Sequence, residues 1–135
     1  MQKIYQSMED NKRYLDERLG TGKNFDVISR MIEMGGKKAC IYFIDGFCKD
    51  DVMQKMLQYF IELKEEDMPS DAEAMAGKHM PYGEIDLADE WEQVLYAFFS
   101  GVFLLLVDGY EKIILIDART YPARSVDEPD KDKVM

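Results

Sequence analysis

The chain has 135 residues, which is enough for one domain and too few for two comfortable ones. Hydrophobic residues make up 47% of the chain, so its composition predicts a packed core and excludes general disorder. The formal net charge of −10 argues against nucleic acids and anionic membrane surfaces as partners, because their phosphates would repel the chain.

The first 36 residues predict two helices. Residues 3–19 place apolar side chains at helical spacing among many charges, and Gly20 would end that helix. Asn24 is a plausible N-cap for a second, short helix with an apolar face. Gly35-Gly36 would end this second helix.

The middle of the chain predicts a buried strand, a helix and a loop. Residues 39–44 are almost all apolar and rich in β-formers, which is typical of a strand inside a sheet. Asp45-Gly46 forms a turn after it. Residues 50–63 carry an amphipathic stripe and predict a helix. The acidic stretch 64–80 then predicts a loop that holds one short helical turn.

The C-terminal part predicts an edge strand, a helix and a hairpin, in that order: residues 82–86, residues 88–99, and residues 102–107 paired with 110–117. Asp108-Gly109 lies between the last two runs and predicts a two-residue type I′ turn. The apolar run 94–107 is too short to span a bilayer, which takes about 20 residues. The start of the chain lacks the apolar core of a signal peptide.

These elements together predict an α/β fold. We expect a mixed sheet of about four strands, with the C-terminal antiparallel hairpin (102–107/110–117) beside strand 39–44 and helices packed on the sheet. Residues 1–120 would form a single α/β subdomain. Residues 121–135 have no apolar period and would form a charged linker toward a second subdomain.

The sequence offers little material for catalysis or metal binding. His79 is the only histidine, and a solvated loop side chain is its simplest interpretation. Cys40, Cys48 and His79 lack the spacing of a zinc site, and we expect neither a metal nor a cofactor. Free, buried thiols are favoured for both cysteines, although the sequence leaves a disulfide open. The chain is therefore not expected to be an enzyme; a hydrolase that uses Asp45 and Asp117 is the least favoured alternative.

A polar segment follows the last predicted strand. Asp117, Arg119, Tyr121 and Arg124 are candidates for an interface or for anchoring the linker, because an arginine can bind a carboxylate through two hydrogen bonds. An internal salt bridge to Asp117 or Glu128 explains the same residues equally well.

Short blocks distributed along the chain resemble the N-terminal region of the GerA-type spore germination proteins, the A subunits of germinant receptors and the related stage V sporulation protein AF. Each block is weak alone, but their order and spacing are specific. They are Asn11 with Leu15 and Leu19-Gly20, Phe25-Asp26-Val27 with Arg30, Gly35-Gly36-Lys37-Lys38, Tyr42, Ile44-Asp45-Gly46, Ser100-Gly101, Val107-Asp108-Gly109, Asp117-x-Arg119-x-Tyr121-Pro122-x-Arg124 and Glu128-Pro129.

The resemblance implies a cytosolic N-terminal region of two α/β subdomains, followed by a membrane domain in the inner membrane of the bacterial spore. It implies a role in germinant sensing, subunit assembly or ion release, and it supplies no catalytic residues. The implied partners are other spore germination membrane subunits, further copies of the full-length protein, and a small-molecule germinant. The alternative is a stand-alone domain that binds an amino acid, sugar or nucleoside near Asp45-Gly46 and Arg119.

Overall fold

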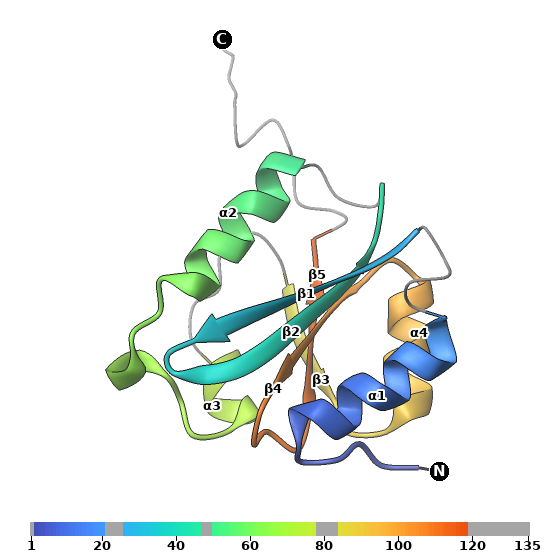
Figure 1. The fold of residues 1–135 in the computed structure, drawn as a ribbon, viewed down its shortest axis with the longest axis horizontal. Helices are drawn as coiled ribbons and strands as arrows, with labels where there is room; N and C mark the ends of the chain where they lie inside the picture. Colours follow the sequence, from blue (N-terminus) through green and yellow to red (C-terminus); the bar gives the residue numbers. More distant parts are fainter. Residues whose placement is uncertain (1, 21–25, 47–49, 78–83, 119–135) are drawn as a thin grey trace, which may run out of the picture.

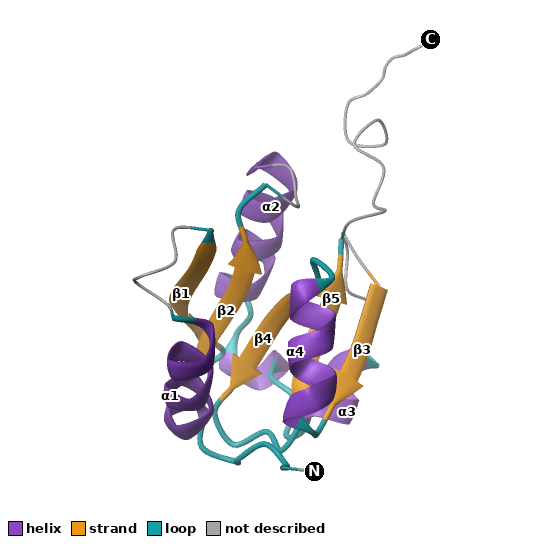
Figure 2. Cartoon of the chain, turned by 90° about the vertical axis from the view of Figure 1, so that its right-hand side faces the viewer, coloured by secondary structure: helices purple, strands orange, loops and turns teal. Residues whose placement is uncertain are grey.

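A computed structural model describes residues 2–20, 26–46, 50–77 and 84–118 (Figure 1). These residues form three layers, with one sheet between two pairs of helices (Figure 2). The elements are α1 (Met8–Leu19), β1 (Val27–Met34), β2 (Lys37–Ile44), α2 (Asp50–Ile61), the 3-10 turn η1 (Glu65–Asp67), α3 (Ala72–Ala76), β3 (Glu84–Ala88), α4 (Trp91–Phe99), β4 (Phe103–Val107) and β5 (Ile113–Asp117).

The sheet has the order β1-β2-β4-β5-β3, and every pair of neighbours is antiparallel. The predicted α/β fold is confirmed, although the sheet holds five strands rather than about four and is antiparallel rather than mixed. Strand 39–44 lies inside the sheet as predicted, within β2. The predicted edge strand is β3, shifted to Glu84–Ala88. The helical turn in the acidic loop is α3, and the predicted helix 50–63 is α2.

Each face of the sheet has its own hydrophobic core. α2 and α3 cover one face, where Phe43 stacks on Phe103. α1 and α4 cover the other face, where Trp91 stacks on Tyr14. Because β2, β4 and β5 are covered on both sides, their sequences are almost continuously apolar, whereas the edge strands β1 and β3 contain exposed positions.

The second predicted helix is wrong, because its residues form β1. Met34 pairs with Lys37, so Gly35-Gly36 is a two-residue hairpin loop rather than a helix end. Both glycines have positive φ, 53° and 84°, as a type I′ turn requires. Pairing with the buried strand β2 therefore outweighs the helical spacing of the apolar residues in this segment.

The C-terminal antiparallel hairpin is confirmed, but its predicted two-residue loop is wrong. Leu105 pairs with Ile114, and β5 begins only at Ile113, so the connection is longer than Asp108-Gly109. Gly109 still forms the turn, with a φ of 90°. The reason for the longer loop is Tyr110, which is buried and donates a hydrogen bond from its hydroxyl to the backbone oxygen of Pro69, at 2.6 Å.

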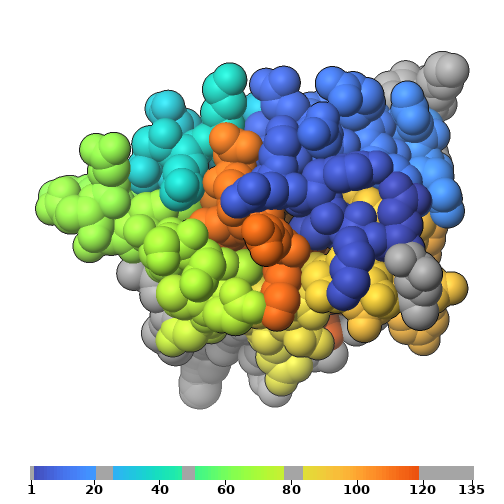
Figure 3. Space-filling model, turned by 90° about the horizontal axis from the view of Figure 1, so that it is seen from below, coloured from blue at the N-terminus to red at the C-terminus, as the bar shows by residue number. Residues whose placement is uncertain are grey.

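The first helix begins at Met8 rather than at residue 3. Ser7 is its N-cap and accepts a hydrogen bond from the backbone N–H of Asp10. The preceding residues run along the start of α4, where Ile4 N–H donates to Asp89 O at 3.0 Å. Seen from below, this N-terminal segment lies beside the β4–β5 connection (Figure 3).

Candidate functional site

A groove opens between α2 and the β1–β2 hairpin, at the end of the sheet where β2 has its last residue. We call it the strand-end groove. Its cavity volume is about 480 Å³, which is within the range of small-molecule sites. It is lined by Ile28, Arg30, Phe43, Ile44, Asp45, Gly46, Met53, Gln54, Leu57, Gln58 and Ile61.

The hairpin and α2 position this lining. Ile28 and Phe43 face each other across β1 and β2, and both contact the α2 side of the core. The Asp45 N–H donates a hydrogen bond to the backbone oxygen of Asp26 at 2.8 Å. This bond extends the pairing of β1 with β2 by one step beyond the two strands. Gly46 follows with a φ of 97°, a backbone conformation that favours glycine.

The groove combines an apolar floor with a polar rim. Phe43 and Met53 are buried in the floor, whereas Arg30, Gln54 and Asp45 are exposed on the rim. A guanidinium, a carboxylate and amide groups around an apolar floor can orient a small polar molecule by hydrogen bonds.

A second polar cluster lies between α1 and β2. The Tyr42 hydroxyl donates to Asp16 Oδ1 at 2.6 Å, and Lys12 Nζ donates to Asp16 Oδ2 at 2.7 Å. Burial, aided by the bond to Asp16, raises the pKa of Tyr42, and the hydrogen bond to Asp16 raises the pKa of Lys12. Tyr42 therefore stays neutral and Lys12 stays charged at neutral pH, and the cluster ties α1 to the sheet.

The predicted free thiol is confirmed for Cys40, which is buried in the core between α1, α4 and the sheet. Burial raises its pKa to about 11, so it stays protonated at neutral pH and is a poor nucleophile. Cys48 lies outside the described residues, and so does His79. Within residues 2–20, 26–46, 50–77 and 84–118, no three His, Cys, Asp or Glu side chains form a group that could hold a metal ion.

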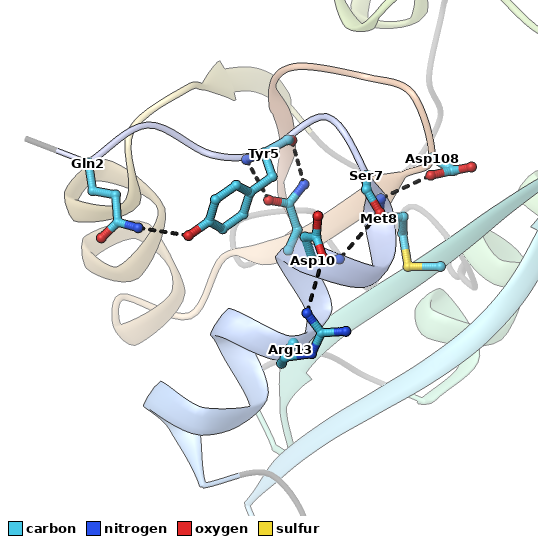
Figure 4. Close-up of polar contacts among 8 residues, drawn as sticks. Gln2, Tyr5, Ser7, Met8, Asp10, Arg13 and Asp108 are labelled. Carbon is cyan, nitrogen blue, oxygen red and sulfur yellow. Dashed lines mark hydrogen bonds and ion pairs between the residues drawn. The ribbon is translucent and has the colours of Figure 1, made fainter.

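The predicted turn residues fall at two different places. Asp45 and Gly46 lie in the strand-end groove. Asp108 instead supports α1, because its Oδ1 accepts a hydrogen bond at 3.0 Å from the N–H of Met8, the first residue of the helix (Figure 4). Gly109 N–H donates to Gln6 O at 3.0 Å. The Asp108-Gly109 turn therefore holds the N-terminal segment.

The candidates for an interface are described only in part. Asp117 is half-buried and ends β5, at the edge of the sheet where β2 also ends. Arg119, Tyr121 and Arg124 lie outside the described residues, so the internal and external pairings of these arginines both remain predictions. Asp117 is the last residue of β5 and Asp45 follows the last residue of β2, and β4 lies between these two strands.

Sequence reasoning missed most of the polar groove lining. The sequence predicts a helix around Arg30, and a helix does not place this residue beside β2. Gln54 and Gln58 are four residues apart and share a face of α2, but only the fold reveals that this face borders Asp45. The Lys12–Asp16 pair had a usable signal, since the two residues are also four apart on a predicted helix.

None of the helices in the described part of the chain is both long and apolar enough to cross a membrane. Residues 13–135 match the model of a family described as the Bacillus/Clostridium GerA spore germination protein.

Two proteins of Bacillus subtilis (strain 168) resemble the chain over almost its whole length. It is 23% identical over 135 residues to stage V sporulation protein AF, covering 98% of this chain, and 26% identical over 142 residues to spore germination protein B1, covering 97%. In both cases the match spans 27% of the relative, so the chain corresponds to about a quarter of these proteins.

A solved structure shares the fold. The chain superimposes on the N-terminal domain of the A subunit of the Bacillus megaterium spore germinant receptor GerK3 with a TM-score of 0.70 and 23% identity. The match covers 85% of this chain and 47% of that one.

Proposed function

Because this chain belongs to the Bacillus/Clostridium GerA spore germination protein family, we propose that it is a non-catalytic, cytosolic domain of a larger protein of the spore inner membrane. There it serves germinant sensing, subunit assembly or ion release. The observation that carries the proposal is the family match over residues 13–135. We assign residues 1–120 to one α/β subdomain and residues 121–135 to a linker toward a second one.

The chemistry of the described residues supports a non-catalytic role. The Cys40 thiol is buried and protonated at neutral pH. Tyr42, Asp16 and Lys12 are engaged with one another. The polar groups on the strand-end groove, which include Arg30 and Asp45, have the character of a binding surface rather than of a reactive pair.

The test uses spores of the bacterium that encodes the chain. Deletion of residues 2–118 from the natural gene should abolish or strongly slow germination, measured as the fall in optical density after germinant addition. Normal germination after the deletion would refute the proposal.

The strand-end groove favours a second function, which is small-molecule sensing. Its volume and its mixed lining fit an amino acid, sugar or nucleoside. Calorimetric titration of the chain with a panel of these compounds tests it, and Arg30→Met serves as the groove variant. Lys55→Met is the matched control, because Lys55 is exposed on α2 and does not line the groove. Binding that is lost only in Arg30→Met would establish this function; absence of binding across the panel would exclude it for these ligands.

A further inference from the structure

The outer face of α4 exposes two aromatic side chains. Tyr96 is 78% exposed and Phe99 is 62% exposed, although Val94 and Phe98 on the same helix are fully buried. Tyr96 and Phe99 are three residues apart and therefore lie on one face of the helix. A single exposed apolar residue needs no explanation, but neighbouring aromatic residues are typical of the central part of a protein interface.

Tyr96 lines a groove between α4 and the edge strand β3, which we call the α4–β3 groove. Its volume is about 460 Å³. Leu115 of β5 and Ala97 of α4 are among its apolar residues, and Tyr96 lies along one side. A neighbouring hollow shares these three residues and extends the surface toward Glu92.

The rim of this surface is acidic. Glu84 of β3 pairs directly with Asp117 of β5, and Asp86 is opposite Leu115 on the same face of the sheet. Glu92 adds a fourth carboxylate. Within the described part of the chain, no ion pair neutralises Glu84, Asp86 or Glu92.

We propose that the α4–β3 groove docks a segment of another germination protein in which an apolar side chain lies between lysine or arginine residues. The apolar side chain would contact Leu115, Ala97 and Tyr96, and the cationic residues would pair with Glu84 and Asp86. This inference rests on the assembly role proposed above. It does not involve the strand-end groove, which lies on the opposite face of the sheet.

Charge complementarity selects this occupant over a second copy of the chain. A symmetric dimer would place the same patch of each copy against its counterpart. The carboxylates of one rim would then face those of the other, and like charges brought together at an interface are costly. The net charge of −10 adds to this repulsion.

The test is site-specific photo-crosslinking in the complete germination protein in spore membranes. A benzoyl-phenylalanine replaces Tyr96 or Phe99 in separate variants, and the crosslinked peptides are sequenced by mass spectrometry. The control position is Lys55, which is exposed on α2 on the other side of the sheet. Both α4 positions should crosslink to one segment of another protein that carries at least two lysine or arginine residues, and position 55 should not.

Charge reversal checks the assignment of the rim. Glu84→Lys with Asp86→Lys should lower the yield of that crosslink about tenfold, because cations would then face cations. Glu33→Lys with Glu66→Lys makes the same change in charge at exposed sites elsewhere and should leave the yield unchanged. Thermal unfolding of the chain with each pair of substitutions confirms that it still folds; Glu84→Lys faces Asp117 and should not destabilise the sheet.

Four outcomes would overturn the inference: no crosslink, a crosslink to a second copy, a crosslink to a segment without basic residues, or a basic crosslink whose yield does not respond to charge reversal at residues 84 and 86. If deletion of residues 2–118 blocks germination while one of these outcomes is found, the docking surface is wrong and the proposed function stands.

Discussion

Substitution of Gly35 by alanine should destabilise the chain far more than the same substitution at Gly20. Both glycines have positive φ, 53° at Gly35 and 66° at Gly20, so each alanine carries the cost of a left-handed backbone. The surroundings differ. A Cβ at Gly35 would lie 2.8 Å from Cβ of Met68 and 3.0 Å from the backbone oxygen of Lys64, whereas a Cβ at Gly20 would have no atom within 4 Å.

The two effects are of different size. The left-handed conformation costs an alanine about 1 kcal/mol, and that is the expected loss for Gly20→Ala. At Gly35 the segment around Met68 must also move, and overpacking of this kind costs about 1–3 kcal/mol. We therefore expect Gly35→Ala to lower the free energy of unfolding by about 2–4 kcal/mol.

Urea unfolding followed by tryptophan fluorescence measures both losses. Trp91 is the only tryptophan and is buried, so its emission shifts to longer wavelength when the chain unfolds. Equal losses for the two variants would refute the reasoning, because they would show that the close approach of Gly35 to Met68 has no energetic consequence. A large loss of unfolding free energy for Gly20→Ala would show instead that the left-handed backbone conformation alone determines the effect.

Three further predictions concern pH, the N-terminal segment and the C-terminal arginines. Burial raises the pKa of Cys40 from 9.0 to about 11 and that of Tyr110 from 10.0 to about 12, so the fold favours the protonated forms. The contribution of these two protonated groups to stability should be complete below pH 9 and lost as the pH rises through 11 to 12. Urea unfolding at pH 8 and at pH 11 measures this loss. Equal free energies of unfolding at the two pH values would contradict the prediction. Asn11 is 2% exposed, and its side-chain amide forms hydrogen bonds of 2.8 Å with both the N–H and the C=O of Tyr5. Asn11→Ala should therefore lower the free energy of unfolding by about 1–3 kcal/mol in the same assay. A loss below about 0.5 kcal/mol would show that water replaces these hydrogen bonds. If Arg124 binds a partner, Arg124→Ala should leave the unfolding free energy within about 0.5 kcal/mol but slow germination of spores; a destabilised chain with normal germination would end the interface interpretation.

The elements predicted correctly are those with a local signal. β2 is a continuous apolar run, and α2 and α4 carry apolar stripes, so each was recognisable without its neighbours. β1 was not, because its apolar residues also fit a helix and its strand pairing depends on β2 across Gly35-Gly36. The loop after β4 is longer than predicted because the Tyr110 hydroxyl donates a hydrogen bond to the backbone of Pro69. These residues are 41 positions apart, so the contact has no local signal in the sequence.

The family resemblance was also predictable from sequence and is confirmed by the match over residues 13–135. Asp45 and Gly46, near which the small-molecule alternative places its ligand, lie in the strand-end groove. The polar residues that complete the groove could not be predicted, because Arg30 and Gln54 come from elements that meet only in the folded chain. The roles of Asp117, Arg119, Tyr121 and Arg124 stay predictions.

The position of β5 has a mechanical consequence. β5 is flanked on both sides, with five registered residue pairs to β3 and three to β4, and it runs directly into Ala118. Hydrogen bonds between antiparallel strands are perpendicular to the strand axis. A pull along β5 from its C-terminal end would therefore load these bonds in shear, so that they must break together rather than in succession. A force applied through the residues that follow Ala118 would reach the whole sheet before it could peel off a strand.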